Sequence, residues 1–225
     1  MNRDWKERLK TEFGYSESLT NILINHGRVR DFRKDVRVKS QGEESKQLLF
    51  ILEGSLVLIR DNPDATEQLA GILSSGYLLN EAYFYYALPA DVHAYTLTEV
   101  TCLCLPSKNV HHLIEHNLEF NQAMAFSLSR KLLFFSQLSY VGKERDMTAK
   151  VRKAIYYLFQ SSKLTVLPIT IIQLASLLGM SRNTVSRALK ESESSGAIEL
   201  LSGTILLKNI EILGCFESDL SNDLY

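Results

Sequence analysis

The segment between residues 170 and 189 constrains the fold more than any other part of the chain, because helix caps, apolar positions and a glycine occur in it at fixed spacing. It reads TIIQLASLLGMSRNTVSRAL. Thr170 and Gln173 have the spacing of a capping box, which predicts the start of a helix. Gly179 can adopt the left-handed conformation that ends a helix, and Ser181 can then cap a second one. The sequence therefore predicts two short helices joined by a tight turn.

Small and apolar residues are placed to hold the two predicted helices together. Leu174 and Leu178 give the first helix an apolar stripe, and Val185 and Leu189, four residues apart, do the same for the second. Ala175 is small at a point where the two helices must approach closely. A pair of this kind is typical of a helix-turn-helix, whose second helix lies in the major groove of DNA.

Polar side chains are left for the outer face of the second helix. An arginine can pair bidentately with guanine and an asparagine with adenine, while hydroxyl groups and helix N-termini can hold phosphates. A helical hairpin with a merely solvated basic face is the alternative, and the common register of caps, glycine and apolar positions argues against it. The predicted DNA-binding residues are Thr170, Ser181, Arg182, Asn183, Thr184, Ser186, Arg187 and Lys190.

The charge along the chain is distributed as expected when only one module contacts a polyanion. The formal net charge of the whole chain is −1 at pH 7. Residues 147–213 carry 8 Lys and Arg against 4 Asp and Glu, an excess of +4. Residues 1–146 carry 17 against 19, and residues 214–225 carry 0 against 3. The basic excess therefore coincides with the predicted helix-turn-helix.

The sequence on either side of the helix pair predicts a winged helix. Asp146 can cap a helical pattern that begins directly after it. Downstream, two apolar runs flank Ser202-Gly203, as in a β-hairpin. The two runs are Ala197 to Leu201 and Thr204 to Leu207. We therefore predict a winged helix-turn-helix domain over residues 146–213, followed by an acidic tail over residues 214–225.

The N-terminal half of the chain reads as a series of short strands separated by turn-type residues, which suggests a sandwich or barrel. The strands are expected at residues 47–52, 55–60, 68–73, 92–98 and 101–105. Two short helices, at residues 4–13 and 16–25, are expected before them. We predict a β-barrel domain over residues 1–116.

A long helix is predicted after the strands, because residues 118–143 contain neither Pro nor Gly before Gly142. Ser107 is the expected N-cap of a shorter helix that precedes it. Apolar residues cover more than one stripe of the long helix, so a single contact face cannot bury them all. Either the helix is sandwiched inside one monomer, or its second face packs on another copy of the chain. We favour the second arrangement and assign residues 117–145 to a dimerisation helix and hinge.

Composition limits the classes of protein that fit. With 225 residues, of which 45% are hydrophobic, the chain is long enough for two modest domains. No apolar stretch has the length of a membrane span, and the charged N-terminus lacks the apolar core of a signal peptide, so we expect a cytoplasmic protein without membrane contact. The three cysteines form neither a disulfide framework nor a zinc pattern. Cys102 and Cys104 are expected to pack in the core.

From about Val29 to Leu207 the chain resembles the Crp/Fnr superfamily of bacterial regulators. The resemblance rests on Gly42-Glu43-Glu44, Leu48 to Leu58, Gly76 to Glu81, Asp146 to Val151 and the helix-turn-helix. It implies an α+β fold with an N-terminal double-stranded β-helix, or jelly roll, of the cyclic nucleotide-binding type, a long dimerisation helix and a C-terminal winged helix-turn-helix. It also implies a homodimer that binds a palindromic promoter site, responds allosterically to an effector and, if it activates transcription, contacts RNA polymerase.

One departure from the family pattern concerns the effector. Cyclic-nucleotide members carry an arginine, followed by Ser or Thr and then Ala, in the loop after the Gly-Glu pair, and this arginine binds the phosphate. The corresponding stretch here is Ala90-Asp91-Val92-His93-Ala94, and no arginine occurs between residues 61 and 108. Because a cyclic phosphate would lack its charge-assisted partner, we expect an effector other than cyclic AMP or cyclic GMP.

An aromatic run, Tyr83 to Tyr86, is the other distinctive feature of this region. We expect it in a loop beside the effector, where an apolar pocket with a few hydroxyl groups suits a small organic molecule. In this the chain resembles the branch of the family that senses halogenated phenols, although the aromatic residues can equally fill the barrel and the dimer seam. The candidate effector-binding residues are Leu79, Asn80, Glu81, Tyr83, Phe84, Tyr85, Tyr86 and His93.

Other sensing chemistries and catalysis find less support in the sequence. Iron–sulfur members of the superfamily need an N-terminal cysteine cluster, and no cysteine precedes Cys102. Haem or redox sensing on the same fold stays an alternative, although the histidines form no recognisable ligand pattern. His112 and His116 are too few for a metal site, so no metal or other cofactor is expected. A cupin-like metal-dependent enzyme needs several ligands on barrel strands, and only His93 lies on one.

Overall fold

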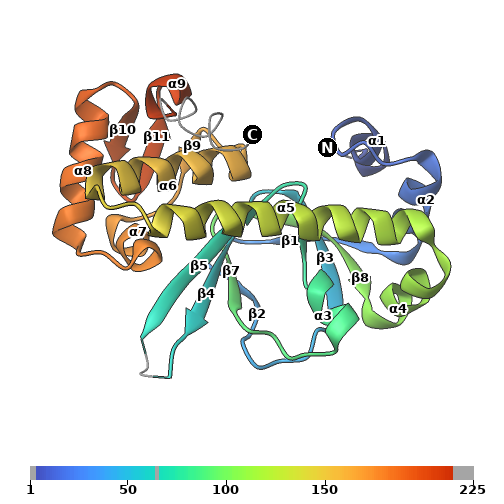
Figure 1. The fold of residues 1–225 in the computed structure, drawn as a ribbon. Coiled ribbons are helices and arrows are strands. Elements are labelled where there is room, and N and C mark those ends of the chain that lie inside the picture. The colour runs from blue at the N-terminus through green and yellow to red at the C-terminus, as the bar shows by residue number, and fades with distance from the viewer. Residues whose placement is uncertain (1–3, 64–65, 215–225) are drawn as a thin grey trace, which may run out of the picture. The chain divides into compact units, whose positions relative to one another are not determined.

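The computed structural model describes residues 4–63 and 66–214 of the chain (Figure 1). The chain divides into two compact units, one comprising residues 1–58 and 73–131 and the other residues 59–72 and 132–225. Each unit therefore draws on two separate stretches of sequence. Within the described ranges, no helix has the length and hydrophobicity that crossing a membrane requires.

Two short helices open the chain, as the sequence predicts. They are α1 (Trp5–Thr11) and α2 (Glu17–His26). The side chain of Asp4 caps the first and that of Ser16 caps the second, because each accepts a backbone N–H from the first turn.

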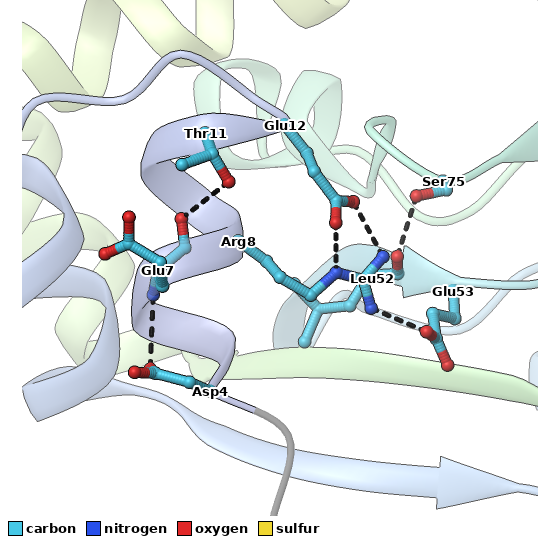
Figure 2. Close-up of polar contacts among 8 residues, drawn as sticks. All are labelled: Asp4, Glu7, Arg8, Thr11, Glu12, Leu52, Glu53 and Ser75. Atoms are coloured by element: carbon cyan, nitrogen blue, oxygen red, sulfur yellow. Dashed lines mark hydrogen bonds and ion pairs between the residues drawn. The ribbon is translucent and has the colours of Figure 1, made fainter.

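A charged cluster connects α1 to Glu53, the last residue of strand β3 (Gln47–Glu53) (Figure 2). The Arg8 guanidinium donates to both carboxylate oxygens of Glu12, at 2.5 and 2.7 Å, and to Glu53 Oε1 at 2.5 Å. The hydrogen bond from Arg8 lowers the pKa of the Glu12 carboxyl. Beside this cluster, the Ser75 hydroxyl donates to the carbonyl of Leu52 at 2.7 Å.

Eight strands in the described part of the first 106 residues form two four-stranded sheets, which agrees with the predicted jelly roll. One sheet has the order β1-β8-β3-β6 and the other β2-β7-β4-β5. The pairs β1 with β8, β3 with β8, β3 with β6 and β2 with β7 are antiparallel. The strands are β1 (Arg28–Phe32), β2 (Arg37–Lys39), β3 (Gln47–Glu53), β4 (Ser55–Asp61), β5 (Glu67–Ser74), β6 (Leu78–Leu79), β7 (His93–Thr96) and β8 (Val100–Pro106). Hydrophobic patterning missed β1, β2 and β6, because β1 is largely exposed and the other two are very short.

The core of the first unit lies against β3 and β8. Leu48, Phe50 and Leu52 alternate along β3, are at most 1% exposed and share one cluster with Leu103 and Leu105 of β8. Helices α1, α2, α4 (Ser107–His116) and α5 (Leu118–Gly142) complete this cluster. Burying each such side chain stabilises the fold by about 1.5–3 kcal/mol, so the cluster is the main reason why the sheet holds together.

Two local predictions were wrong. The aromatic run expected in a loop lies in helix α3 (Glu81–Tyr86), which begins after Asn80 with a φ of 89°. Ser107 is the first residue of α4, and Pro106 occupies the cap position without a side-chain hydrogen bond. The backbone N–H of Ser107 donates instead to the carbonyl of Lys46, so the pairing of β8 with β3 continues up to the helix.

Helix α5 is continuous, as predicted, and its apolar residues fall into a buried and an exposed set. Phe120, Met124 and Ser127 are buried in its first half, and Phe134 and Val141 in its second. This spacing of three, four and seven residues defines a single stripe. The large apolar residues that α5 leaves exposed are Leu118, Phe126, Leu132, Leu133, Phe135 and Tyr140.

The C-terminal part of the chain is a winged helix. Its elements are α6 (Met147–Ser162), β9 (Val166–Leu167), α7 (Ile171–Leu178), α8 (Arg182–Ser194), β10 (Ile198–Leu201), β11 (Thr204–Leu207) and α9 (Ile210–Leu213). Asp146 caps α6, and β10 and β11 form the predicted hairpin. The short strand β9 was not predicted, and it adds a third strand next to β11. Val151, Ile155 and Leu158 of α6 are fully buried, as are Val185 and Leu189 of α8, so these two helices form the centre of the domain.

Candidate nucleic-acid interface and effector site

The turn between α7 and α8 has the geometry that the sequence predicts. The Thr170 hydroxyl accepts the backbone N–H of Gln173 at 3.2 Å, and Gln173 Oε1 accepts the backbone N–H of Thr170 at 2.9 Å, which completes the capping box. Gly179 ends α7 with a φ of 61° and a ψ of 36°, both left-handed. Ser181 then accepts the backbone N–H of Thr184 at 3.2 Å and caps α8. These caps fix which side chains of α8 face outward.

Helix α8 buries one face and exposes the other. On the inner face, Val185, Ala188 and Leu189 are at most 1% exposed. The long polar residues that the sequence assigned to DNA are all exposed, namely Arg182, Asn183, Arg187 and Lys190. Because residues four apart share a helix face, Asn183 lies beside Arg187. This surface presents guanidinium and amide groups to solvent from a rigid helix.

The hydroxyl-bearing residues of the predicted interface lie at the beginning of the two helices. Thr170 and Ser181 are exposed, whereas Thr184 and Ser186 are half-buried in the first turns of α8. The Ser181 and Thr184 hydroxyls are 2.8 Å apart, so both take part in the cap. The backbone N–H groups at the start of α8 form the positive end of the helix dipole. An anion such as a DNA phosphate is stabilised at such an end.

In the first unit, Glu81 is the centre of a buried polar cluster. Its side chain is 1% exposed. Its Oε1 accepts the Ser127 hydroxyl at 2.8 Å, and its two oxygens lie 2.7 and 2.8 Å from Lys131 Nζ. Lys131 also donates to the carbonyl of Leu78 at 2.6 Å. The carboxylate is thus paired and hydrogen-bonded by α5 of its own chain, which is the condition for burying a charge.

Asn80, the residue before Glu81, accepts a hydrogen bond from Lys39, a buried cation that sequence reasoning missed. Asn80 Oδ1 accepts from Lys39 Nζ at 2.5 Å, and Asn80 Nδ2 donates to the carbonyl of Gln47 at 2.8 Å. Lys39 belongs to β2 and is only 7% exposed. The pairing of β2 with β7 shifts register between Arg37 and Lys39, and this irregularity cannot be recognised in the sequence. A lysine in a three-residue strand gives no other signal that it is buried.

The aromatic residues of α3 separate into different environments. Tyr83 lies under Lys39 Nζ, which is 3.5 Å from its ring centroid, and its hydroxyl donates to Asp91. Phe84 belongs to the core cluster. Tyr85 and Tyr86 are 44% and 76% exposed, and the Tyr85 hydroxyl donates to Asn121 of α5 at 2.8 Å. The four aromatic residues therefore do not line one pocket.

The other candidate residues of this region are placed as follows. Leu79 is 3% exposed and pairs with Leu49 of β3. His93 is half-buried on β7, and its Nδ1 accepts the backbone N–H of Gln41 at 3.0 Å. Leu79 thus serves the core, and His93 holds the chain that follows β2.

Within the described part of the chain, Cys102 and Cys104 pack in the interior, and His112 and His116 contact each other. Cys102 and Cys104 are buried, and burial raises the pKa of the first thiol to about 12 and of the second to about 11. His112 and His116 stack on α4 with ring centroids 4.6 Å apart. No group of three or more metal-ligating side chains occurs in residues 4–63 and 66–214.

Two family models match the chain in succession. The cyclic nucleotide-binding domain matches residues 29–117, and the Crp-like helix-turn-helix domain matches residues 149–216. The first range contains both sheets apart from the first residue of β1, together with α3 and α4, and the second contains α7 and α8.

Solved structures support the same fold at low sequence identity. The c-di-GMP responsive global regulator CLP of Xanthomonas campestris superposes with a TM-score of 0.70 at 19% identity, over 86% of this chain and 100% of that one. CprK in complex with OCPA superposes with a TM-score of 0.61 at 18% identity, over 89% of this chain and 94% of that one.

Curated relatives align across both domains. The CRP-like cAMP-activated global transcriptional regulator of Mycobacterium tuberculosis is 26% identical over 190 residues, which span 81% of this chain and 85% of the relative. The cAMP-activated global transcriptional regulator CRP of Salmonella typhimurium is 22% identical over 194 residues, which span 82% and 91%. Together with the outward polar face of α8, these matches identify the chain as a Crp/Fnr-family transcription regulator, in which a domain of the cyclic nucleotide-binding type precedes a Crp-like helix-turn-helix.

Proposed function

We propose that the chain acts as a homodimer that reads a palindromic promoter site through α8 and changes its affinity for DNA when a small organic effector binds to the N-terminal domain. The outer face of α8 carries this proposal. Arg182, Asn183 and Arg187 project from a helix whose opposite side is fixed in the core by Val185 and Leu189. Side chains with this chemistry form the commonest bidentate contacts to guanine and adenine.

The hydroxyl and ammonium groups around this face suit the DNA backbone. Thr170 and Ser181 are exposed at the N-termini of α7 and α8, where the helix dipole favours phosphate. We assign them to phosphate contacts, together with Thr184, Ser186 and Lys190. Such contacts position the protein on the duplex, whereas Arg182, Asn183 and Arg187 distinguish bases.

The exposed apolar side chains of α5 support a dimer. Phe126, Leu132 and Leu133 are 64%, 71% and 65% exposed, which is unusual for three large apolar residues on one helix. A second copy of α5 packed on this side would cover them with the same residues, as two-fold symmetry requires. Two α8 helices spaced roughly 34 Å apart would then enter successive major grooves.

Three segments of the chain take separate roles in this proposal. Effector sensing belongs to residues 1–116, dimerisation and hinge movement to residues 117–145, and DNA binding to residues 146–213. As an activator, such a dimer would also contact RNA polymerase. Residues 214–225 fall outside the described part of the chain except for Gly214, and they receive no role here.

The effector is proposed to be other than a cyclic nucleotide. The stretch Ala90 to Ala94, which the resemblance matches to the phosphate-binding loop of the cyclic-nucleotide members, contains no arginine. Glu81 is already paired with Ser127 and Lys131. The exposed rings of Tyr85 and Tyr86 offer aromatic surface instead, and on them rests the proposed resemblance to the branch that senses halogenated phenols.

Selection of bound sequences from random duplex DNA tests the DNA-binding proposal. We expect a two-fold symmetric consensus, and we expect Arg187→Ala to lose about 1–3 kcal/mol of binding to it. Arg145→Ala is the matched control, because Arg145 is an exposed arginine in the segment between α5 and α6 and is not part of α8. An asymmetric consensus, or an equal loss for both variants, would contradict the proposed reading by α8.

Sedimentation of Leu133→Arg tests the dimer. A charge in the centre of the exposed apolar side of α5 should convert the dimer into monomers, because an unpaired guanidinium would be buried between the copies. Leu88→Arg is the control, since Leu88 is 59% exposed but follows α3 instead of lying on α5. Dimers that survive the first substitution would exclude this face as the interface.

A further inference from the structure

The ammonium group of Lys39 is buried without a carboxylate as its direct partner. Its side chain comes from β2, and the residue is 7% exposed. Its contacts are the side-chain Oδ1 of Asn80 at 2.5 Å, the Ser45 hydroxyl at 3.5 Å and the ring centroid of Tyr83 at 3.5 Å. All three partners are electrically neutral. A buried charge is normally paired or else strongly disfavoured, so this arrangement needs an explanation.

Neither hydrogen-bond partner of the Lys39 amine carries a charge, although charged side chains nearby affect its pKa. Asp91 and Glu81 favour the charged amine, and Lys131 disfavours it. Asp91 is engaged by the Tyr83 hydroxyl, and Glu81 is paired with Lys131. Burial dominates, and it lowers the pKa of the Lys39 amine to about 8. The fold therefore holds this amine in a site that disfavours its charged form.

A cavity lies next to this group. It has a volume of about 410 Å³, within the range of small-molecule sites. The buried residues Lys39 and Asn80 line it, together with Ser45 of the segment that joins β2 to β3 and Gln47 at the start of β3. The remaining lining residues are Val38, Glu43, Glu44 and Lys46. Of these charged residues, Glu43, Glu44 and Lys46 are exposed, so only Lys39 contributes a desolvated charge.

We propose that Lys39 is the anchor for a small organic anion bearing a single carboxylate, which binds in the cavity lined by Lys39, Ser45, Gln47 and Asn80. The carboxylate supplies the counter-charge that the neutral partners of the amine do not. Ser45 and Asn80 add hydrogen-bonding groups beside it. This inference rests on the proposed function, because it names the chemical class of that regulator's effector.

The charge of the site favours a monoanion over a phosphate dianion. One buried ammonium balances one negative charge, and two carboxylates, those of Glu43 and Glu44, also line the cavity. A second negative charge on the ligand would face these carboxylates without a further buried cation. On this proposal Lys39 of β2 takes the place of the arginine that residues 61–108 lack, and it balances a single negative charge on the ligand.

Thermal unfolding with matched probes tests the proposal. Acetate, benzoate and phenylacetate are compared with acetamide, benzamide and phenylacetamide, which have nearly the same shape without the charge. A ligand that binds only the folded state raises Tm, and at a given concentration a ligand of higher affinity raises it more. We expect at least one carboxylate to raise Tm and its amide to have no effect. Inorganic phosphate is expected to raise Tm less than that carboxylate.

Two variants separate anchoring from a structural role of the amine. Lys39→Met should abolish the carboxylate-dependent shift, and it should unfold at the same temperature as the wild type or higher when no ligand is added. Lys34→Met is the control, since Lys34 is exposed before β2, and it should keep the full shift. A Lys39→Met protein that is clearly less stable than the wild type would mean that the amine only supports the fold, and would overturn the proposal.

The pH dependence gives an independent readout. The bound carboxylate needs the protonated amine, whose pKa without ligand is lowered to about 8 by burial. Affinity should therefore be constant below about pH 8 and fall up to tenfold for each pH unit above it, until the pKa of the complex is reached. Lys34→Met should show the same profile as the wild type. A profile that is flat across this range would overturn the assignment to Lys39.

Binding to duplex DNA is measured on the same preparations, so that the two proposals can fail separately. Wild-type protein that binds duplex DNA but is stabilised by none of the carboxylates, or equally by amides or phosphate, overturns the inference about Lys39 alone. Protein that binds a carboxylate through Lys39 but ignores duplex DNA at low ionic strength overturns the proposed DNA-binding function instead.

Discussion

Replacing Lys131 by methionine should destabilise the unit that contains Glu81 by about 3 kcal/mol. Glu81 is 1% exposed, so its carboxylate cannot turn to water when its partner is removed. Breaking a buried pair by removing one partner costs about 3–5 kcal/mol. The lower end applies here, because the Ser127 hydroxyl at 2.8 Å still donates to the carboxylate and the Lys131 side chain is itself 16% exposed.

The double variant Glu81→Gln with Lys131→Met separates the lost pair from lost packing. Glutamine keeps the shape of Glu81 and can still accept from Ser127, but it carries no charge to leave unpaired. We expect the double variant to recover most of the loss, to within about 1 kcal/mol of the wild type, because replacing both charges is often close to neutral. This recovery is the signature of a desolvated charge.

Urea unfolding followed by tryptophan fluorescence measures both variants. Trp5 is the single tryptophan of the chain, and it packs against the core cluster of the unit that contains Glu81. With an m-value of about 2 kcal/mol/M, a loss of about 3 kcal/mol lowers the unfolding midpoint by about 1.5 M. A loss below about 1 kcal/mol for Lys131→Met, or a double variant as unstable as the single one, would refute this account of the pair.

Four further substitutions and one labelling experiment have distinct expected outcomes. Gly54→Ala should prevent stable folding, because at a φ of +83° an added Cβ would overlap the carbonyl oxygen of Glu99. Gly179→Ala, also at positive φ but with open space around it, should cost only about 1–2 kcal/mol in the free energy of unfolding. Equal losses of unfolding free energy for the Gly54→Ala and Gly179→Ala variants, measured by urea unfolding, would contradict the argument from the space around each glycine. Thr170→Ala should cost about 1 kcal/mol through loss of the cap, whereas Thr170→Ser should cost little, as measured by the same assay. Cys102 and Cys104 should resist iodoacetamide at pH 8 in mass-spectrometric labelling, because burial raises the pKa of their thiols to about 12 and about 11; rapid labelling of the folded protein would contradict this.

The winged helix could be predicted closely from the sequence because its signals are local. The capping box of Thr170 and Gln173, the left-handed Gly179 and the cap at Ser181 each depend on residues within one or two turns. Propensities and caps act over this range, so they can be recognised without knowledge of the fold. The long helix α5 was predicted for the same reason, since no Pro or Gly interrupts it before Gly142.

The surroundings of Lys39 and Glu81 in the N-terminal domain were predicted less completely, because the contacts there join residues far apart in the sequence. Lys39 meets Asn80 across 41 residues, and Glu81 meets Lys131 across 50. No periodicity marks either pair, and Lys39 turns inward through an irregularity in strand pairing. The aromatic run was expected in a loop beside the effector, but it forms helix α3, which turns by about 100° per residue and so spreads Tyr83, Phe84 and Tyr86 over different sides.

Within a single turn, helix α5 carries both a residue that contacts the proposed effector site and residues of the proposed dimer face. Lys131 reaches inward to Glu81, and the next two residues, Leu132 and Leu133, are 71% and 65% exposed. Because adjacent residues of a rigid helix cannot move independently, any rotation of α5 that changes the Lys131 contact also moves these leucines. A ligand at Lys39 acts on the same cluster, since Asn80 directly precedes Glu81. A ligand that binds more strongly when α5 is in one of two orientations would therefore shift the chain toward that orientation, which is sufficient for allosteric control.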